Sequence, residues 1–189
     1  MAARRQEEEG VRGGILRVGT IGEPATLDEH TTTTFTAELM YPVYETLFTY
    51  DAEYNVVPEL VDTHTVSDDG LVHTMTLRQG ITFHNGEPMT AADVHASVTR
   101  WASISGVGKN LFEAVDEFVE VDDHTVEFRL SRPYGTILVA LSHNTQACTI
   151  HPKSIMDAAG DTPFTDDSMV VGTGPYKFLE RQADAYIRL

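Results

Sequence analysis

The sequence predicts an α/β fold, and three observations lead to that prediction. Residues 71–77 and 125–130 alternate apolar and polar side chains with the period of two that is typical of a half-buried strand. Residues 90–101 place apolar side chains at helical spacing behind a capping signal. The chain has 189 residues and 41% hydrophobic content, which suffices for one sizeable packed domain or two small ones.

The stretch 66–101 predicts a hairpin followed by a helix. Asp68–Gly70 forms the turn before the first alternating strand, since glycine supplies the positive φ that a short hairpin loop needs. Asn85–Pro88 forms a second turn. Thr90 with Asp93 three residues later is a capping pattern that predicts the helix start. The apolar stripe of this helix consists of Val94, Val98 and Trp101.

Shorter elements are expected on either side of this stretch. Ile15–Thr20 predicts a strand, and the apolar spacing over residues 37–48 predicts a helix that Pro42 kinks or delays. Residues 118–130 predict a second hairpin around Asp122–His124. Four further segments complete the expected layout: a loop at 102–110, a short helix at 133–141, a helix from Pro152 that Gly160 ends, and a strand starting at Tyr176.

The charge of the chain restricts its partners. Asp and Glu outnumber Lys and Arg by 29 to 13, for a net charge of −16, so nucleic acid and anionic membrane surfaces are excluded as favourable partners. Cys148 is the only cysteine and is expected to be a small buried hydrophobe. The longest apolar run, Ile137–Leu141, is too short to span a membrane, and the acidic residues 7–9 do not fit a secretion signal.

Catalytic and metal-binding patterns are absent from the sequence. No zinc-protease histidine pair, no Cys-x-x-Cys motif, no phosphate-binding loop and no Gly-x-Ser-x-Gly elbow occurs, which argues against an enzyme and against a resident metal or other cofactor. The eight histidines are therefore interpreted as surface or turn residues. They are His30, His64, His73, His84, His95, His124, His143 and His151.

Three strings carry a family resemblance: DDGLVHTMTLRQGITFHNGEPMTAADVHASVTR at 68–100, DDHTVEFRL at 122–130, and GTGPYKF at 172–178. They resemble the family 5 extracellular solute-binding proteins, which are the dipeptide, oligopeptide and nickel receptors of ABC importers. The resemblance runs from Ile15 to Leu189 and covers only the amino-terminal portion of that family.

The resemblance implies a partial periplasmic-binding-protein type II-like lobe with a hairpin-rich α+β subdomain. Residues 1–14 would be a disordered tail, 15–50 and 168–189 part of the main lobe (first strand, loop, helix and return strand), and 51–167 the subdomain. The implied function is capture of a peptide or another small polar solute for ABC permease subunits, with no chemical step. The implied location is extracytoplasmic, in the periplasm or at the outer face of the cell membrane, with contact to the membrane only through the transporter or an anchor outside this chain.

In the family, the loop after the first strand lies at the lip of the ligand cleft. The resemblance therefore points to Glu23, Thr32, Thr33 and Thr34 as ligand-binding residues, since hydroxyls and backbone amides there can bind a polar solute. A solvated threonine-rich loop on an acidic surface is the alternative interpretation. Two alternatives to solute capture also stay open: a truncated remnant that binds nothing, and a hydrolytic or metal-dependent enzyme.

The low lysine content and the acidic surface lead to one prediction about solvent. Such surfaces are typical of proteins that work in high salt, where counterions screen the repulsion between carboxylates. We expect the melting temperature to rise between dilute buffer and on the order of 1 M KCl. A protein that is folded and no less stable in dilute buffer would contradict the halophilic interpretation.

Overall fold

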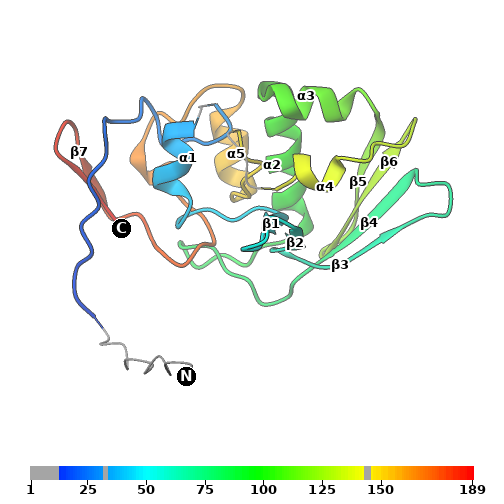
Figure 1. Cartoon of the computed structure of the whole chain (residues 1–189), viewed down its shortest axis with the longest axis horizontal. Coiled ribbons are helices and arrows are strands. Elements are labelled where there is room, and N and C mark those ends of the chain that lie inside the picture. The colour runs from blue at the N-terminus through cyan, green and yellow to red at the C-terminus, as the bar shows by residue number, and fades with distance from the viewer. Residues whose placement is uncertain (1–12, 32–33, 143–145) are drawn as a thin grey trace, which may run out of the picture.

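The computed structural model describes residues 13–31, 34–142 and 146–189, a mixed α/β structure (Figure 1). The helices of the described part are α1 (Thr34–Met40), α2 (Ala91–Ile104), α3 (Gly106–Phe112), α4 (Ile137–Ala140), α5 (Lys153–Ala159) and the 3-10 turn η1 (Asp167–Met169). The strands are β1 (Phe48–Tyr50), β2 (Val56–Pro58), β3 (Val61–Val66), β4 (Val72–Leu77), β5 (Val115–Asp122), β6 (Thr125–Leu130), β7 (Glu180–Gln182) and β8 (Tyr186–Arg188). None of the helices among the described residues is both long and apolar enough to cross a membrane.

The largest sheet has the order β3-β4-β6-β5, and each neighbouring pair is antiparallel. Both predicted hairpins are confirmed: β3 and β4 turn through Gly70 at a φ of 74°, and β5 and β6 turn at residues 123–124. Along β4 and β6 every second side chain is buried, as the alternation predicts. Helix α2 lies across the apolar face of this sheet (Figure 1).

The main hydrophobic core lies between α2 and the sheet. Val94, Val98 and Trp101 are fully buried there, which confirms the predicted apolar stripe. The indole nitrogen of Trp101 donates to the carbonyl oxygen of Gln146 at 2.6 Å, so burial of the ring leaves no unpaired polar atom. Cys148 is also fully buried, as expected.

The predicted start of α2 is confirmed, and the cap residue Asp93 links two helices. One oxygen of its carboxylate accepts hydrogen bonds from the backbone N–H and the hydroxyl of Thr90 at 2.8 and 2.9 Å. Its other oxygen accepts from the backbone N–H of Lys153, the first residue of α5, at 2.7 Å. One carboxylate therefore satisfies donors at the amino ends of both helices.

The prediction of a loop at 102–110 is wrong. Helix α2 continues to Ile104, and α3 starts two residues later behind Ser105, whose hydroxyl accepts from the backbone of Val107 and Gly108. Gly108 permits this sharp change of direction, because a Cβ there would lie 2.7 Å from the Cα of Ala102. Gly106 and Gly108, which suggested a loop, thus lie in α3, and Ser105 caps that helix.

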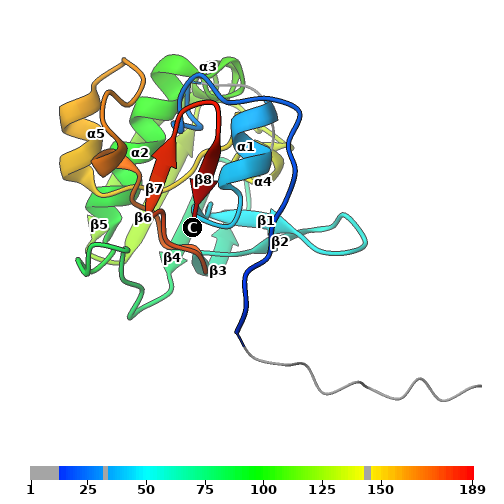
Figure 2. The same ribbon diagram turned by 90° about the vertical axis from the view of Figure 1, so that its left-hand side faces the viewer.

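Two predictions near the amino end are also wrong. Ile15–Thr20 is exposed, non-helical chain without strand pairing in the described structure; it runs away from the body in Figures 1 and 2. A strand needs a neighbour for its backbone groups, and no described segment supplies one. Helix α1 ends at Met40, because Pro42 cannot continue it, and residues 48–50 form β1 instead.

The carboxyl-terminal strand starts later than expected. Residues 176–179 are irregular, and the hairpin of β7 and β8 begins at Glu180 (Figure 2). A smaller second core joins this end of the chain to the amino-terminal part, around the buried residues Leu27, Met40, Val43, Tyr44 and Val170. The division into a tail, a partial main lobe (15–50 and 168–189) and a subdomain (51–167) stays a prediction. Residues 1–12 of the expected tail lie outside the described residues.

The turn at 172–176 packs directly on the chain after α1. The backbone N–H of Gly174 donates to the carbonyl of Val43 at 3.0 Å, and that of Tyr176 to the carbonyl of Pro42 at 2.9 Å. His84 holds the other side, since its Nε2 donates to the Gly174 carbonyl at 2.8 Å. The backbones approach so closely that only glycine fits at position 172.

We therefore expect Gly172→Ala to destabilise the fold. The new Cβ would lie 2.1 Å from the carbonyl oxygen of Val43, and one of the two backbones must move. Such overpacking should lower the free energy of unfolding by about 1–3 kcal/mol or more, measured by urea denaturation. Gly135→Ala is the matched control, because a Cβ there meets no atom within 4 Å. Equal effects of the two substitutions would contradict the proposed close approach.

Candidate ligand-binding loop and its buried anchor

The candidate site is built on the loop 22–31, which leads into the predicted threonines. Local hydrogen bonds shape this loop: the backbone N–H of Asp28 donates to Thr26 Oγ1 at 3.2 Å, and that of His30 to Asp28 Oδ1 at 3.0 Å. The Thr31 hydroxyl donates to the Asp28 carbonyl at 3.2 Å. These are the side-chain to backbone turns that Asp and Thr favour, and they give the loop a defined shape.

Two hydrogen bonds attach the loop to α1 and to the chain after it. The hydroxyl of Thr36 donates to the carbonyl of Thr26 at 3.0 Å, and that of the fully buried Tyr44 donates to the carbonyl of Leu27 at 3.0 Å. These bonds therefore join the loop to the part of the chain that follows the threonines at 32–34.

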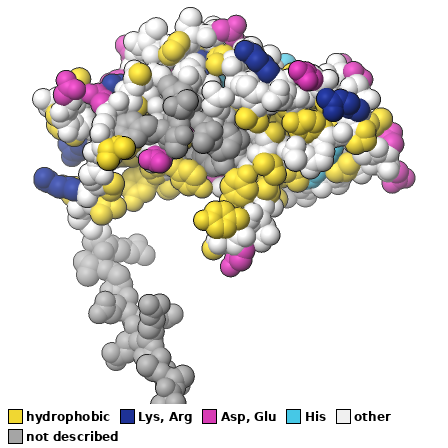
Figure 3. Space-filling view, turned by 45° about the horizontal axis from the view of Figure 1, so that its top comes forward, with side chains coloured by type: hydrophobic (Ala, Val, Ile, Leu, Met, Phe, Trp, Pro, Cys, Tyr) yellow, Lys and Arg dark blue, Asp and Glu magenta, His cyan; other side chains and the backbone are white. Residues whose placement is uncertain are grey.

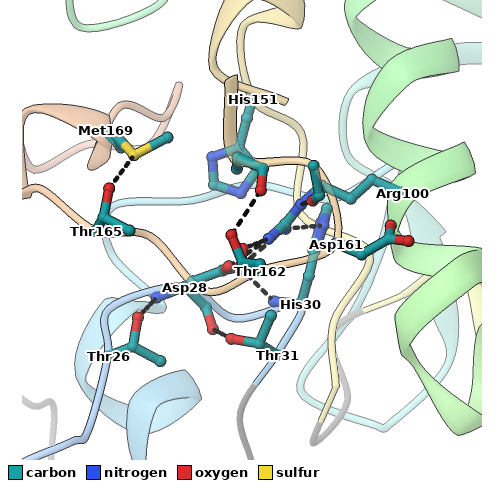
Figure 4. A network of polar contacts seen from close by, with 12 residues as sticks. Thr26, Asp28, His30, Thr31, Arg100, His151, Asp161, Thr162, Thr165 and Met169 are labelled. Carbon is teal, nitrogen blue, oxygen red and sulfur yellow. Dashed lines mark hydrogen bonds and ion pairs between the residues drawn. The ribbon is translucent and has the colours of Figure 1, made fainter. Parts of the chain in front are cut away.

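A buried ion pair anchors the loop to α2 (Figure 4). The Arg100 guanidinium donates through two nitrogens to the two carboxylate oxygens of Asp28, at 2.6 and 3.2 Å. The side chains are only 4% and 0% exposed. Arg100 also donates to the carbonyl oxygens of Gly160 and Thr162 at 2.6 and 2.7 Å. One side chain thus joins the loop, α2 and the end of α5.

Arg100 also determines the tautomer of His30. The guanidinium can only donate, so the His30 Nδ1, 3.0 Å away, must accept. The hydrogen of the neutral ring is then on Nε2, which donates to the carbonyl of Thr149 at 2.8 Å. Burial lowers the pKa of His30 to about 3, and the positive charge of Arg100 acts in the same direction.

His151 extends the network toward the turn at 172–176. Its Nδ1 donates to the Val171 carbonyl at 3.2 Å, and its Nε2 accepts from the Thr149 hydroxyl at 2.9 Å. Burial and the neighbouring His30 lower the pKa of His151 to about 3. Because the unfolded chain binds protons at both rings near pH 6.5 and the folded chain does not, they cost the fold stability as the pH falls from about 6.5 to about 3.

Glu29 differs from its neighbours in the loop. It is 1% exposed, and neither carboxylate oxygen has a hydrogen-bond partner among the residues that the structure describes. Burial raises its pKa well above the usual range, and the adjacent Asp28 acts in the same direction. The environment therefore favours the neutral acid at this position.

The four predicted ligand residues lie in different surroundings, and two of them fall outside the part of the chain that the structure describes. Thr32 and Thr33 lie outside the described residues, and Thr34 is the first residue of α1. Glu23 is engaged by the β7–β8 hairpin: its carboxylate accepts from Arg181 Nε at 2.7 Å and from the backbone N–H of Asp184 at 2.6 Å. The Asp184 N–H and then Arg181 lower its pKa. Its role as a ligand residue stays a prediction, and any ligand there would share a carboxylate already bonded on two sides.

Several residues of the anchor were missed in the sequence or interpreted wrongly. His151 is fully buried outside any turn, and His73 is 7% exposed within β4, so the interpretation of the histidines as surface or turn residues is wrong for these two. His30 does lie in a turn, although it is fully buried. The available signal was Arg100, a cation next to the apolar stripe of α2. Its partner Asp28 is 72 residues away, a distance over which local patterns carry no information.

The chain matches a family model over residues 55–189, namely that of the bacterial extracellular solute-binding proteins, family 5 middle region. It is 32% identical over 137 residues to a probable peptide ABC transporter periplasmic-binding protein y4tO of Sinorhizobium fredii, covering 72% of this chain and 25% of that protein. It is 35% identical over 136 residues to the glutathione-binding protein GsiB of Salmonella typhi, covering 71% and 26%. The chain thus belongs to the family 5 extracellular solute-binding proteins, a family that is not enzymatic.

Solved structures agree with this assignment. The periplasmic binding protein AgaA of A. tumefaciens R10, in complex with agropinic acid, superposes with a TM-score of 0.76 at 28% identity, over 88% of this chain and 33% of that one. The oligopeptide-binding protein AppA of Bacillus subtilis, in complex with a nonapeptide, gives 0.74 at 25% identity, over 89% and 34%. The chain spans about a quarter of the length of the curated relatives and a third of that of the solved structures.

We expect Asp28→Asn to cost about 3–5 kcal/mol of folding free energy, because it leaves the buried Arg100 without a compensating charge. The matched control is Glu117→Gln. Glu117 pairs with Arg129 at the same 2.6 Å, but the two side chains are 60% and 46% exposed. The control should cost less than about 1 kcal/mol. Denaturant titration of both variants measures the difference, and similar losses would mean that the Asp28–Arg100 pair is not the anchor.

Proposed function

We propose that this chain is part of the solute receptor of a peptide-type ABC importer, and that the loop 22–34 forms one wall of its ligand cleft. The observation that carries the proposal is the family match over residues 55–189, together with relatives named as a peptide ABC transporter periplasmic-binding protein and a glutathione-binding protein. The proposed solute is a peptide or a similar small polar molecule. The proposed partners are the permease subunits of the importer, and the proposed location is extracytoplasmic.

The geometry of the loop supports this proposal. Binding is stronger when the groups that contact the ligand are held in place beforehand, since less conformational entropy is lost. The described end of the loop, Thr26–Thr31, is held by the Asp28–Arg100 pair and by Thr36 and Tyr44. Threonine hydroxyls and backbone amides that follow such an anchor can bind the polar backbone of a peptide without burying a charge.

The proposed mechanism is closure of a cleft between two lobes. A solute that binds the closed state more tightly shifts the population toward that state, and the permease recognises the closed receptor. Micromolar affinity requires about 8 kcal/mol of net binding free energy. One wall of a cleft rarely supplies that much, so the second wall is expected to come from the part of the relatives that this chain does not span.

The proposal is tested on the receptor purified from its native cells, after its intact mass shows whether the product exceeds 20.9 kDa. Isothermal titration calorimetry with a dipeptide, an oligopeptide and glutathione should find stoichiometric binding of at least one. The triple substitution of Thr32, Thr33 and Thr34 by alanine should then weaken binding about tenfold or more, because each lost hydrogen bond contributes about 0.5–1.5 kcal/mol.

The matched control replaces two threonines of β3, Thr63 and Thr65, which are exposed and lie in a different element. This control should leave the affinity unchanged, and both sets of substitutions should leave the melting temperature nearly unchanged. Full affinity in the triple variant would place the ligand elsewhere. Absence of binding by a native product of 20.9 kDa would favour the remnant that binds nothing. Catalytic turnover that a single His or Asp substitution abolishes would favour the alternative that the chain is a hydrolytic or metal-dependent enzyme.

A further inference from the structure

Two histidines on the β3–β4 hairpin form a contact that differs from the other histidine contacts of the described structure. The Nε2 of His64 lies 3.1 Å from the Nδ1 of His73. The ring planes are 13° apart with centroids 5.2 Å apart. Because the two nitrogens are much closer than the centroids, the rings meet edge to edge and share one hydrogen. By contrast, His30, His84 and His95 each bond a backbone carbonyl through Nε2.

The strand register places this pair on one face of the hairpin. His64 is paired with Met75, and His73 with Val66, so the two histidines are diagonal neighbours across adjacent strands. His73 is 7% exposed, whereas His64 is half-buried on the edge strand of the sheet, with Phe48 against its ring. The inner ring is therefore buried, and the outer ring is partly exposed to solvent.

We propose that His64 and His73 are a two-histidine site for a borderline divalent transition-metal ion such as Zn²⁺ or Cu²⁺. Two Zn–N bonds of about 2.0–2.1 Å at a near-tetrahedral angle place the ligand nitrogens about 3.3 Å apart, close to the 3.1 Å in the structure. The metal ion would replace the shared hydrogen, and the rings would tilt so that both lone pairs point at the ion. This site is separate from the loop 22–34 and does not depend on the proposed function.

The surroundings suit a neutral imidazole ligand. Burial lowers the pKa of both rings; for His64 the neighbouring His73 acts in the same direction, and for His73 a hydrogen bond to Gly70 acts against it. The site rests on geometry: two imidazole nitrogens lie 3.1 Å apart, with one ring buried and the other half-buried. Nowhere in the described part of the chain do three or more His, Cys, Asp or Glu side chains gather around a metal-sized space. Water would complete the coordination here, so binding should be reversible and sensitive to chelators.

The experiment titrates the chain with ZnCl₂ at about pH 7.5 by calorimetry, and repeats it in His64→Gln, His73→Gln and the control His95→Gln. His95 is the matched control because its Nε2 contacts the carbonyl of Phe118, not a second imidazole. We expect each variant of the pair to lose at least about tenfold in affinity, and the control to bind like the unchanged chain.

Two further measurements keep the test decisive if the buried His73 variant folds poorly. His64→Gln changes a half-buried ring on an edge strand, and its circular dichroism should match that of the unchanged chain. Electron paramagnetic resonance of bound Cu²⁺ should show two imidazole nitrogens in the unchanged chain and one in His64→Gln. Zn²⁺ affinity that stays the same in His64→Gln, or that falls equally in His95→Gln, would overturn the proposal.

Discussion

The buried ion pair between Arg100 and Asp28 is the interaction on which the arrangement of the candidate site depends. Moving a guanidinium and a carboxylate out of water costs several kcal/mol for each ion, and the cost is offset only when both are fully hydrogen-bonded. Here the guanidinium bonds both carboxylate oxygens, His30 and two backbone carbonyls. Such a pair contributes little net stability over an apolar replacement, but it tolerates only one arrangement of the segments that carry it.

This requirement explains why the surrounding residues are neutral and buried. Burial lowers the pKa of His30 and His151 to about 3, and the positive charge of Arg100 acts in the same direction, so both rings are neutral in the fold. Their ring hydrogens are directed to carbonyls of Thr149 and Val171, so the network runs from the loop 22–31 to the turn at 172–176. The loop proposed to bind solute is thereby connected to the segment that packs on the chain after α1.

The glycine turn and the ion pair both join segments that are far apart in the chain, but the two contacts differ in how closely the backbones approach. At Gly172 and Gly174 the backbones of two distant segments touch directly, and the absence of a side chain makes the contact possible. At Arg100 the segments are farther apart, and a long side chain bridges them. Both contacts join the amino-terminal and carboxyl-terminal parts of the chain, which enclose the second small core. The β3–β4 hairpin reaches to the side of the molecule away from α1 and β7 (Figure 1). Figure 3 shows acidic side chains scattered over the face that it displays, in keeping with the net charge of −16.

The sequence by itself determined the local elements: the two hairpins, the capped helix α2 and the helix α5 that Gly160 ends. Their signals are periodicity, turn residues and caps, which act within a few residues and need no distant partner. The tertiary structure decided whether Ile15–Thr20 could be a strand, since pairing depends on a neighbour that no local pattern contains. It also decided that Pro42 ends α1 and that Gly106 and Gly108 lie in a helix. In the site, the loop was found through its resemblance to a family. Its anchor was not, because burial of Arg100, Asp28 and two histidines is set by contacts between residues that are far apart in the chain and adjacent only in the fold.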